Sequence, residues 1–304
     1  MAGGNDGMRR NSHAIGAVPR LLQAAYVAAD RALWSEAEKL LKEVIELEPQ
    51  CVDAFVKLGL IWETQGRLTE AREVLERAVG LEERQPVLTL LGSVQRRLGD
   101  NSAALDTVTR SLSLDPHDDE ALHLLALLVR EADPLKAVEH FNRVLSLDPT
   151  HHYTHREMGL ALWKAGRLND AIAACRRAIE IDPNDAWAHN YLGDILFASH
   201  RAEDARREYV RATELAPANG LLWASLGRLS SSLGEYARAE KFFRRGLALA
   251  IDEPVLHREY GILLQKTGCL TSAKRYLKRA LELNPNQGRA REALAEIEAN
   301  EKGI

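Results

Sequence analysis

Cysteine and long apolar segments are both scarce in this sequence of 304 residues. The three cysteines, Cys51, Cys175 and Cys269, lie far apart and form no CxxC pair, so we expect neither a disulfide framework nor a zinc site. The longest apolar run, residues 124–129, is far shorter than the roughly 20 residues that cross a bilayer. Residues 1–17 contain no apolar stretch typical of a signal peptide. These absences favour a cytoplasmic protein without a membrane span.

Sequence motifs of catalysis and cofactor binding are also missing. We find no GxxxxGKS/T loop for phosphates, no GxSxG nucleophile and no HExxH zinc site. The segment HHYTH at 151–155 places its histidines at packing and turn positions, which favours a structural role over a metal site. Cys175 falls at a buried apolar position, where cysteine usually acts as a small hydrophobic side chain. We therefore expect no enzymatic activity, no cofactor and no metal site.

Positive charge is not in excess. The chain has 40 lysines and arginines against 44 aspartates and glutamates, a formal net charge of −4. A protein that binds nucleic acid mainly through phosphates needs clustered excess positive charge, so we do not expect a nucleic-acid partner. With 46% apolar and 28% charged residues, the composition is that of a globular protein.

Small residues recur along the chain with a fixed period. A series of alanines has successive separations of 33 or 34 residues, and glycines and prolines keep the same period at two other positions. The segments at 155–166 and 257–268 are near copies, and their offset of 102 residues is three times 34. Three markers that share one period indicate tandem repeats. The aligned alanines are Ala37, Ala71, Ala104, Ala137, Ala171, Ala205, Ala239 and Ala273.

Each repeat contains two apolar patterns with helical spacing. In residues 152–185, one pattern precedes the Gly-containing segment AGRL at 165–168 and a second follows it. A proline ends the second pattern because it cannot continue a helix. Each repeat is therefore predicted to be a hairpin of two helices. Where these helices cross, we expect Gly or Ala, as at Ala171 and Gly193, because a side chain beyond Cβ would meet the opposing backbone.

The proline positions divide the chain into eight repeats. We expect a flexible N-terminal arm over residues 1–17 before them, and a capping helix with a tail over residues 288–304 after them. One hairpin cannot bury its apolar face alone, so the repeats must stack on one another. The eight repeats are 18–51, 52–84, 85–118, 119–151, 152–185, 186–219, 220–253 and 254–287.

The repeat length and its marker residues resemble those of the tetratricopeptide repeat. That family has small residues at positions 8, 20 and 27 and proline at position 32, and residues 186–219 carry all four as Gly193, Ala205, Ala212 and Pro217. The resemblance implies an all-α, right-handed α-solenoid of helix–turn–helix repeats. At position 4, where the family usually has a bulky aromatic residue, three repeats instead have His155, His189 and His257.

The resemblance also implies a concave face lined by the first helices, with positions 2, 5, 6, 9, 12 and 13 of each repeat facing inward. Those positions hold five aromatic residues in the two repeats over residues 152–219. Aromatic rings beside arginine and asparagine suit peptide anchoring, although Trp163 and Phe197 fit packing against a neighbouring helix equally well. The candidate peptide-binding residues are Tyr153, Arg156, Trp163, Trp187, Asn190, Tyr191, Asp194, Phe197 and Arg228.

Two Arg-Glu pairs occur at equivalent positions three repeats apart. We expect them to be surface ion pairs rather than two equivalent partner contacts. The pairs are Arg156 with Glu157 and Arg258 with Glu259, and each is followed by a lysine at an equivalent position, Lys164 and Lys266.

These features together predict a non-enzymatic scaffold or adaptor that binds a peptide segment of a partner protein in the concave groove. Two alternatives stay open. A regulatory or targeting subunit of a larger enzyme, or of a secretion or assembly complex, would show the same features. RNA binding by a related helical repeat is less favoured, because the sequence pI is about 6.2 and Asp53, Glu63 and Asp194 lie at inward positions.

Overall fold

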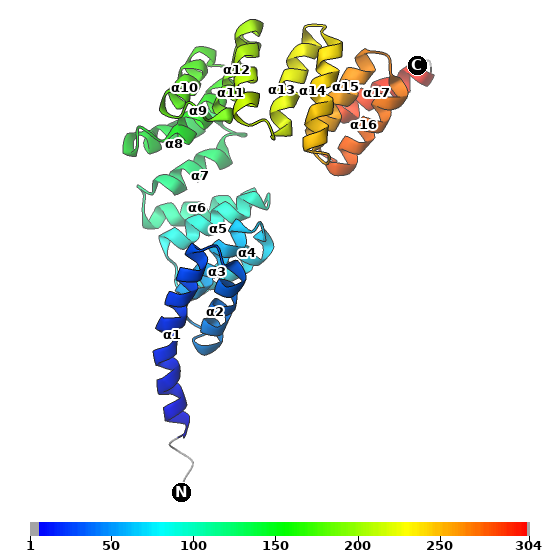
Figure 1. The fold of residues 1–304 in the computed structure, drawn as a ribbon. Coiled ribbons are helices and arrows are strands. Elements are labelled where there is room, and N and C mark those ends of the chain that lie inside the picture. Colours follow the sequence, from blue (N-terminus) through cyan, green and yellow to red (C-terminus); the bar gives the residue numbers. More distant parts are fainter. Residues whose placement is uncertain (1–5, 303–304) are drawn as a thin grey trace. The chain divides into compact units, whose positions relative to one another are not determined.

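The computed structural model describes residues 6–302, with side chains described for residues 16–300. Over residues 6–302 the only regular secondary structure is helical, and the helices follow one another in the order drawn in Figure 1. None of the helices in this range has the length and apolarity that crossing a bilayer requires. The helices are α1 (Asp6–Asp30), α2 (Trp34–Leu47), α3 (Val52–Thr64), α4 (Leu68–Leu81), α5 (Gln85–Arg97), α6 (Asn101–Leu114), α7 (Asp119–Val129), α8 (Pro134–Leu147), α9 (His152–Lys164), α10 (Leu168–Ile181), α11 (Ala186–Ala198), α12 (Ala202–Leu215), α13 (Gly220–Ser232), α14 (Tyr236–Leu249), α15 (Pro254–Lys266), α16 (Leu270–Leu283) and α17 (Gly288–Lys302).

The helices pair into consecutive hairpins, followed by the single helix α17. The two helices of each hairpin contact each other, from α1 with α2 to α15 with α16. The prediction of an all-α solenoid of helix–turn–helix repeats is therefore confirmed. The first helices of the second to eighth hairpins begin at residues 52, 85, 119, 152, 186, 220 and 254, the same residues that begin the sequence repeats.

The hairpins group into two compact units, residues 1–147 and 148–304. The first compact unit contains α1 to α8 and the second contains α9 to α17. In the second unit each first helix also contacts the next first helix, from α9 through α11, α13 and α15 to α17. Ala290, Ala293 and Ile297 of α17 are buried in the same apolar cluster as residues of α15 and α16. This row of first helices carries all the candidate binding residues.

The N-terminal segment is more helical than its sequence indicates. Residues 1–5 lie outside the described part of the chain, and residues 6–17, expected as a flexible arm, form the first half of α1. The helix continues through Pro19 into the first hairpin, where Val18 and Ala25 are buried.

Glycine makes the turn inside most hairpins. The turn glycines have φ angles between 75° and 83°, a left-handed conformation that residues with a Cβ atom adopt only at a cost. In the hairpins that begin with α1 and α11, Ala32 and His200 adopt this conformation instead. The turn glycines are Gly66, Gly99, Gly166, Gly234 and Gly268.

The two helices of a hairpin approach closely at the small residue of the first helix. A Cβ atom on Gly193 would lie 2.6 Å from Cε1 of Tyr209, and one on Gly92 would lie 2.6 Å from Cγ2 of Val108. The nearest obstacle is thus not the opposing backbone but a side chain of the second helix that fills the space above the glycine. Backbone atoms come next at some crossings, for example 3.2 Å from a Cβ atom on Gly159 and 3.3 Å from one on Gly261. The crossing pairs are Gly59 with Leu75, Gly92 with Val108, Gly159 with Cys175, Gly193 with Tyr209, Gly227 with Phe243 and Gly261 with Leu277.

We predict that Gly193→Ala destabilises the protein by about 1–3 kcal/mol, because the new methyl group would overlap the rigid ring of Tyr209. The measurement is the urea denaturation midpoint followed by circular dichroism. Gly80→Ala is the control, since Gly80 lies inside α4 with no atom near its missing Cβ. This control should gain about 0.5–1 kcal/mol from helix propensity. Equal effects of the two substitutions would contradict the close crossing.

Candidate functional site

Hydrogen bonds from position 4 tie the first helices of the second compact unit to the preceding turns. From α9 to α15, a ring nitrogen at this position lies 2.6–3.3 Å from the carbonyl oxygen six residues earlier. In α17, Arg291 donates to the Pro285 carbonyl in the same way at 2.7 Å. The side chains at position 4, three of which are histidines, thus fix the start of each first helix in this unit. The ring pairs are His155 with Pro149, His189 with Pro183, Trp223 with Pro217 and His257 with Ile251.

The candidate residues on these first helices are buried to different degrees. Tyr153 at the start of α9 is 50% exposed, whereas Asn190 in α11 is only 4% exposed. The other candidates are partly buried, so their side chains offer limited but accessible surface. This intermediate group contains Arg156, Trp163, Trp187, Tyr191, Asp194, Phe197 and Arg228.

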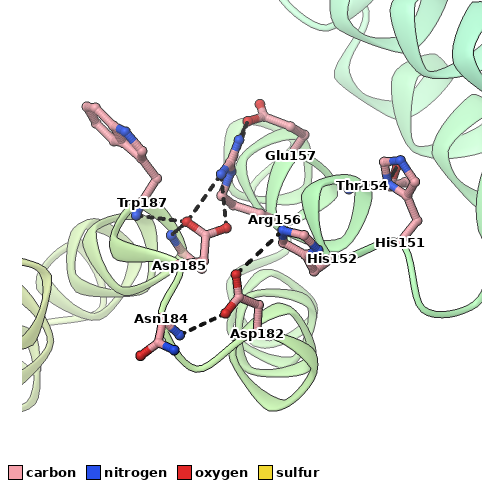
Figure 2. Close-up of polar contacts among 10 residues, drawn as sticks. His151, His152, Thr154, Arg156, Glu157, Asp182, Asn184, Asp185 and Trp187 are labelled. Atoms are coloured by element: carbon pink, nitrogen blue, oxygen red, sulfur yellow. Dashed lines mark hydrogen bonds and ion pairs between the residues drawn. The ribbon is translucent and has the colours of Figure 1, made fainter. Parts of the chain in front are cut away.

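Arg156 is the centre of a first cluster (Figure 2). Its Nη1 donates to the two carboxylate oxygens of Asp185 at 2.9 and 3.2 Å, and its Nε and Nη2 donate to Glu157 at 3.2 and 3.1 Å. The guanidinium carbon lies 4.9 Å from the ring centre of Tyr153 and 5.9 Å from that of Tyr191. Burial opposes the positive charge, but the two carboxylates outweigh it and raise the pKa of Arg156. Arg156 is therefore a fixed cation against which both tyrosine rings pack.

Asp185 connects this cluster to helix α11. Its Oδ1 accepts hydrogen bonds from the backbone N–H groups of Trp187 and Ala188 at 2.9 and 3.0 Å, as Figure 2 shows for Trp187, so Asp185 is the N-cap of α11. The side chains of Arg156 and Asp185 are 15% and 5% exposed. One carboxylate thus holds both the cation and the start of the helix that carries Trp187. The Trp187 ring in turn lies 5.9 Å from the ring of Tyr191.

The expectation that the two Arg-Glu pairs lie on the surface was wrong. All four side chains are mostly buried, and each arginine also reaches the residue that precedes the next first helix, or α17 in the case of the last repeat. The arginines therefore link neighbouring repeats instead of pairing in solvent. The links are Arg156 to Asp185 and Arg258 to Gln287, each spanning 29 residues.

Asp194 is the centre of a second cluster, between α11, α12 and α13. Its Oδ1 accepts from the Tyr209 hydroxyl at 2.6 Å and from Nη2 of Arg228 at 2.7 Å. Asn190 Nδ2 lies 3.5 Å from the other carboxylate oxygen, and Arg228 also donates to Ser225 at 3.3 Å. Burial and the Asp194 carboxylate raise the pKa of Tyr209, so its hydroxyl remains a donor. Burial lowers the pKa of Arg228, but the negative charge of Asp194 has the larger effect, so the pKa of Arg228 is raised overall.

Helix α11 carries members of both clusters. Tyr191 and Trp187 belong to the first cluster, and Asn190 and Asp194 belong to the second. The two clusters are therefore neighbours along helix α11. The remaining candidates, Trp163 and Phe197, lie near the carboxyl ends of α9 and α11.

Sequence reasoning missed two residues that organise this site, Asp185 and Tyr209. Asp185 had a usable signal, because it directly precedes a helical pattern, where an aspartate commonly serves as the N-cap. No sequence signal assigns Tyr209 to the candidate binding face, because Tyr209 belongs to a second helix and this face is formed by first helices. It reaches Asp194 only because it fills the crossing above Gly193.

The histidine cluster and Cys175 make structural contacts. His151 Nδ1 accepts from the Thr154 backbone N–H at 3.2 Å and caps α9, and His152 Nε2 lies 3.7 Å from the Asp182 carboxylate. Among the described residues, no three or more His, Cys, Asp or Glu side chains are grouped so as to hold a metal ion. Cys175 is fully buried, and burial raises the pKa of its thiol to about 12, which leaves it neutral and unreactive near pH 7.

We predict that Asp185→Ala destabilises the second compact unit by about 2–3 kcal/mol, since it removes an N-cap and also a carboxylate from a mostly buried arginine. Asn219→Ala is the matched control, because Asn219 caps α13 through Leu221 N–H at 3.1 Å without an arginine partner among the described contacts, and should cost about 1 kcal/mol. Chemical denaturation of both variants measures the difference. Equal losses would show that the bond to Arg156 contributes nothing.

Comparisons with known proteins agree on one repeat family. Profiles of the tetratricopeptide repeat match residues 162–229, residues 22–86 and 126–186, residues 222–255 and residues 259–287. Together these matches extend over most of the chain between residues 22 and 287.

Solved structures with the same fold have low sequence identity to this chain. A tetratricopeptide repeat protein from Parabacteroides merdae is 20% identical, with a TM-score of 0.69 over 81% of this chain and 98% of that one. The Cut9–Hcn1 hetero-tetramer of APC/C is 18% identical, with a TM-score of 0.65 over 91% of this chain and 55% of that one. PilF of Pseudomonas aeruginosa is 18% identical, with a TM-score of 0.54 over 70% of this chain and 97% of that one. These likenesses establish a shared fold.

Proposed function

Because the chain belongs to the tetratricopeptide repeat family, we propose that it is a non-enzymatic scaffold for protein–protein interaction. Its binding face is the row of first helices in the second compact unit. The ligand is an extended segment of a partner protein that lies across α9, α11 and α13 and contacts both clusters.

The observation that carries this proposal is the aromatic group around Arg156. Tyr153, Trp187 and Tyr191 retain accessible surface although they pack on one another or on a guanidinium group that is itself held by two carboxylates. Rings fixed before binding lose little conformational entropy when a ligand covers them. Apolar or proline side chains of the ligand have a rigid surface to pack on here.

The second cluster supplies directional contacts beside these rings. Arg228 has a 38% exposed side chain, and only its Nη2 is used in bonds to Asp194 and Ser225 among the described residues. Its other N–H groups are available to a carbonyl or carboxylate of the ligand. Asn190, which is only 4% exposed, contributes indirectly, because its Nδ2 lies 3.5 Å from the Asp194 carboxylate that holds Arg228. These polar groups would set the position of a segment that the rings anchor.

We predict that Tyr153→Ala/Trp187→Ala/Arg228→Gln removes partner capture. The three changes delete two anchoring rings and one directional cation, and hot-spot residues of this kind each contribute about 2 kcal/mol or more to binding. The measurement is affinity purification from an extract of the source cells with quantitative mass spectrometry.

Tyr236→Ala is the control for this experiment, because Tyr236 is a comparably exposed aromatic residue, at 42%, that begins a second helix. It should retain every protein captured by the wild type. An unchanged set of captured proteins in the triple variant, at an unchanged melting temperature, would exclude this face as the binding surface.

A further inference from the structure

The outer face of the second compact unit has a charge pattern unlike that of the whole chain. We consider positions 22, 25 and 26 of each repeat, which lie on the second helices. In α10, α12, α14 and α16, ten of these twelve residues are lysine or arginine and none is acidic. We call these ten residues the basic ridge. They are Arg176, Arg177, Arg207, Arg211, Lys241, Arg244, Arg245, Arg275, Lys278 and Arg279.

The same positions in the first compact unit provide an internal comparison. In α2, α4, α6 and α8 they hold five basic and five acidic residues, so the bias does not follow from the fold. The acidic residues there are Glu43, Glu73, Glu76, Asp106 and Glu139, and the basic residues are Lys39, Lys42, Arg77, Arg110 and Arg143.

Every residue of the basic ridge is exposed. In α14, for example, Ala239, Phe243 and Gly246 are buried, which leaves Lys241 and Arg245 on the opposite side of the helix. Because equivalent positions of consecutive repeats point the same way, the ten side chains form one row across four hairpins. This row lies on the second helices, on the side of the hairpins away from the aromatic face of the first helices.

Buried or half-buried rings support the ridge where it crosses from α14 to α16. Nε of Arg244 donates to the Tyr260 hydroxyl at 3.2 Å, and the Tyr260 and Tyr276 rings meet edge to face at 4.7 Å. The guanidinium group of Arg275 stacks on Tyr276 at 5.2 Å, and that of Arg245 lies over a tryptophan ring at 4.6 Å. These contacts hold arginines on the ridge and cover the faces of the rings.

Half of the ridge residues form no ion pair among the described residues. Lys241 and Arg245, and likewise Arg275 and Arg279, are like charges four residues apart on one helix, an arrangement that destabilises the helix. Lys241 and Lys278 make no ion pair among the described residues. Four ridge arginines contact exposed carboxylates on their own helices, and surface pairs of this kind are weak. Arg207 contacts the half-buried Asp204, and Arg279 also contacts Asp252.

The surroundings of the ridge indicate which kind of anion fits it. Acidic residues border the row, among them Glu180, Glu214 and Glu282 at position 29, so a bulky polyphosphate or a flat anionic membrane would bring its own charges against them. No exposed ring projects from the ridge for base stacking, and the largest apolar side chain at the three positions is Val210. A thin chain with spaced carboxylates avoids these conflicts.

From this arrangement we propose that the basic ridge docks an acidic segment of a partner protein. An extended chain advances about 3.3 Å per residue, so a segment of moderate length can cross several hairpins. Spaced glutamates or aspartates along such a segment would meet basic residues on more than one hairpin. Arginine, which forms eight of the ten residues, binds carboxylates through two parallel N–H groups.

The test uses the whole chain and a fluorescent peptide with glutamate at every third residue among glycine and serine. Binding is measured by anisotropy near physiological salt. The wild type should bind this peptide, and the version with glutamine should not bind. Lys241→Glu/Lys278→Glu should weaken binding about tenfold or more without lowering the melting temperature, because neither lysine makes an ion pair among the described residues and the change at Lys241 removes a like-charge pair with Arg245.

Lys39→Glu/Arg77→Glu is the charge-matched control, since these residues occupy equivalent positions in the first compact unit, and it should leave the affinity unchanged. An equal loss in this control would overturn the proposal, because net charge alone would then explain binding. Tighter binding of single-stranded RNA, duplex DNA or phosphatidylserine vesicles than of the peptide would also overturn it. Salt-dependent dimerisation by sedimentation that blocks the peptide would identify a second copy as the occupant and refute a separate partner.

Discussion

The close crossing seen at a glycine in six of the eight hairpins is the constraint on which the rest of this structure depends. A glycine of the first helix leaves room for one side chain of the second, as Gly193 does for Tyr209 and Gly92 for Val108. Close packing of this kind fixes how the two helices meet, because neither can shift without overlap or a void. Repeating the pair every 33 or 34 residues keeps equivalent positions of successive hairpins in register.

Because the repeats are in register, residues that are far apart in the sequence lie side by side on the first helices and on the second helices. On the first helices this register lets Arg156 reach Asp185, the cap of the next first helix, and it brings Asp194 to Arg228. On the second helices it aligns basic side chains of four hairpins into one row. The two proposed surfaces use opposite sides of the same hairpins, so they share no residues.

The start of each hairpin after the first could be read from the sequence, because proline and turn glycine mark it locally. Long-range polar pairing could not be read in this way. Arg156 with Glu157 resembles an ordinary surface pair until the structure brings Asp185 beside it. The sequence located the helix crossing at Gly193 correctly. It could not show that the Tyr209 ring fills the space there, because no local pattern specifies the rotamer of that side chain. The division into two compact units after residue 147 likewise has no marker in a sequence whose repeat period continues through it.

The most direct test of the crossing is a double-mutant cycle between Gly92 and Val108. A Cβ atom on Gly92 would lie 2.6 Å from Cγ2 of Val108, and its next neighbour would be 3.4 Å away. Free energies of unfolding should show that Gly92→Ala costs much less in the Val108→Ala background than in the wild type, with a coupling energy of about 1 kcal/mol or more. Additive effects of the two substitutions would contradict the account.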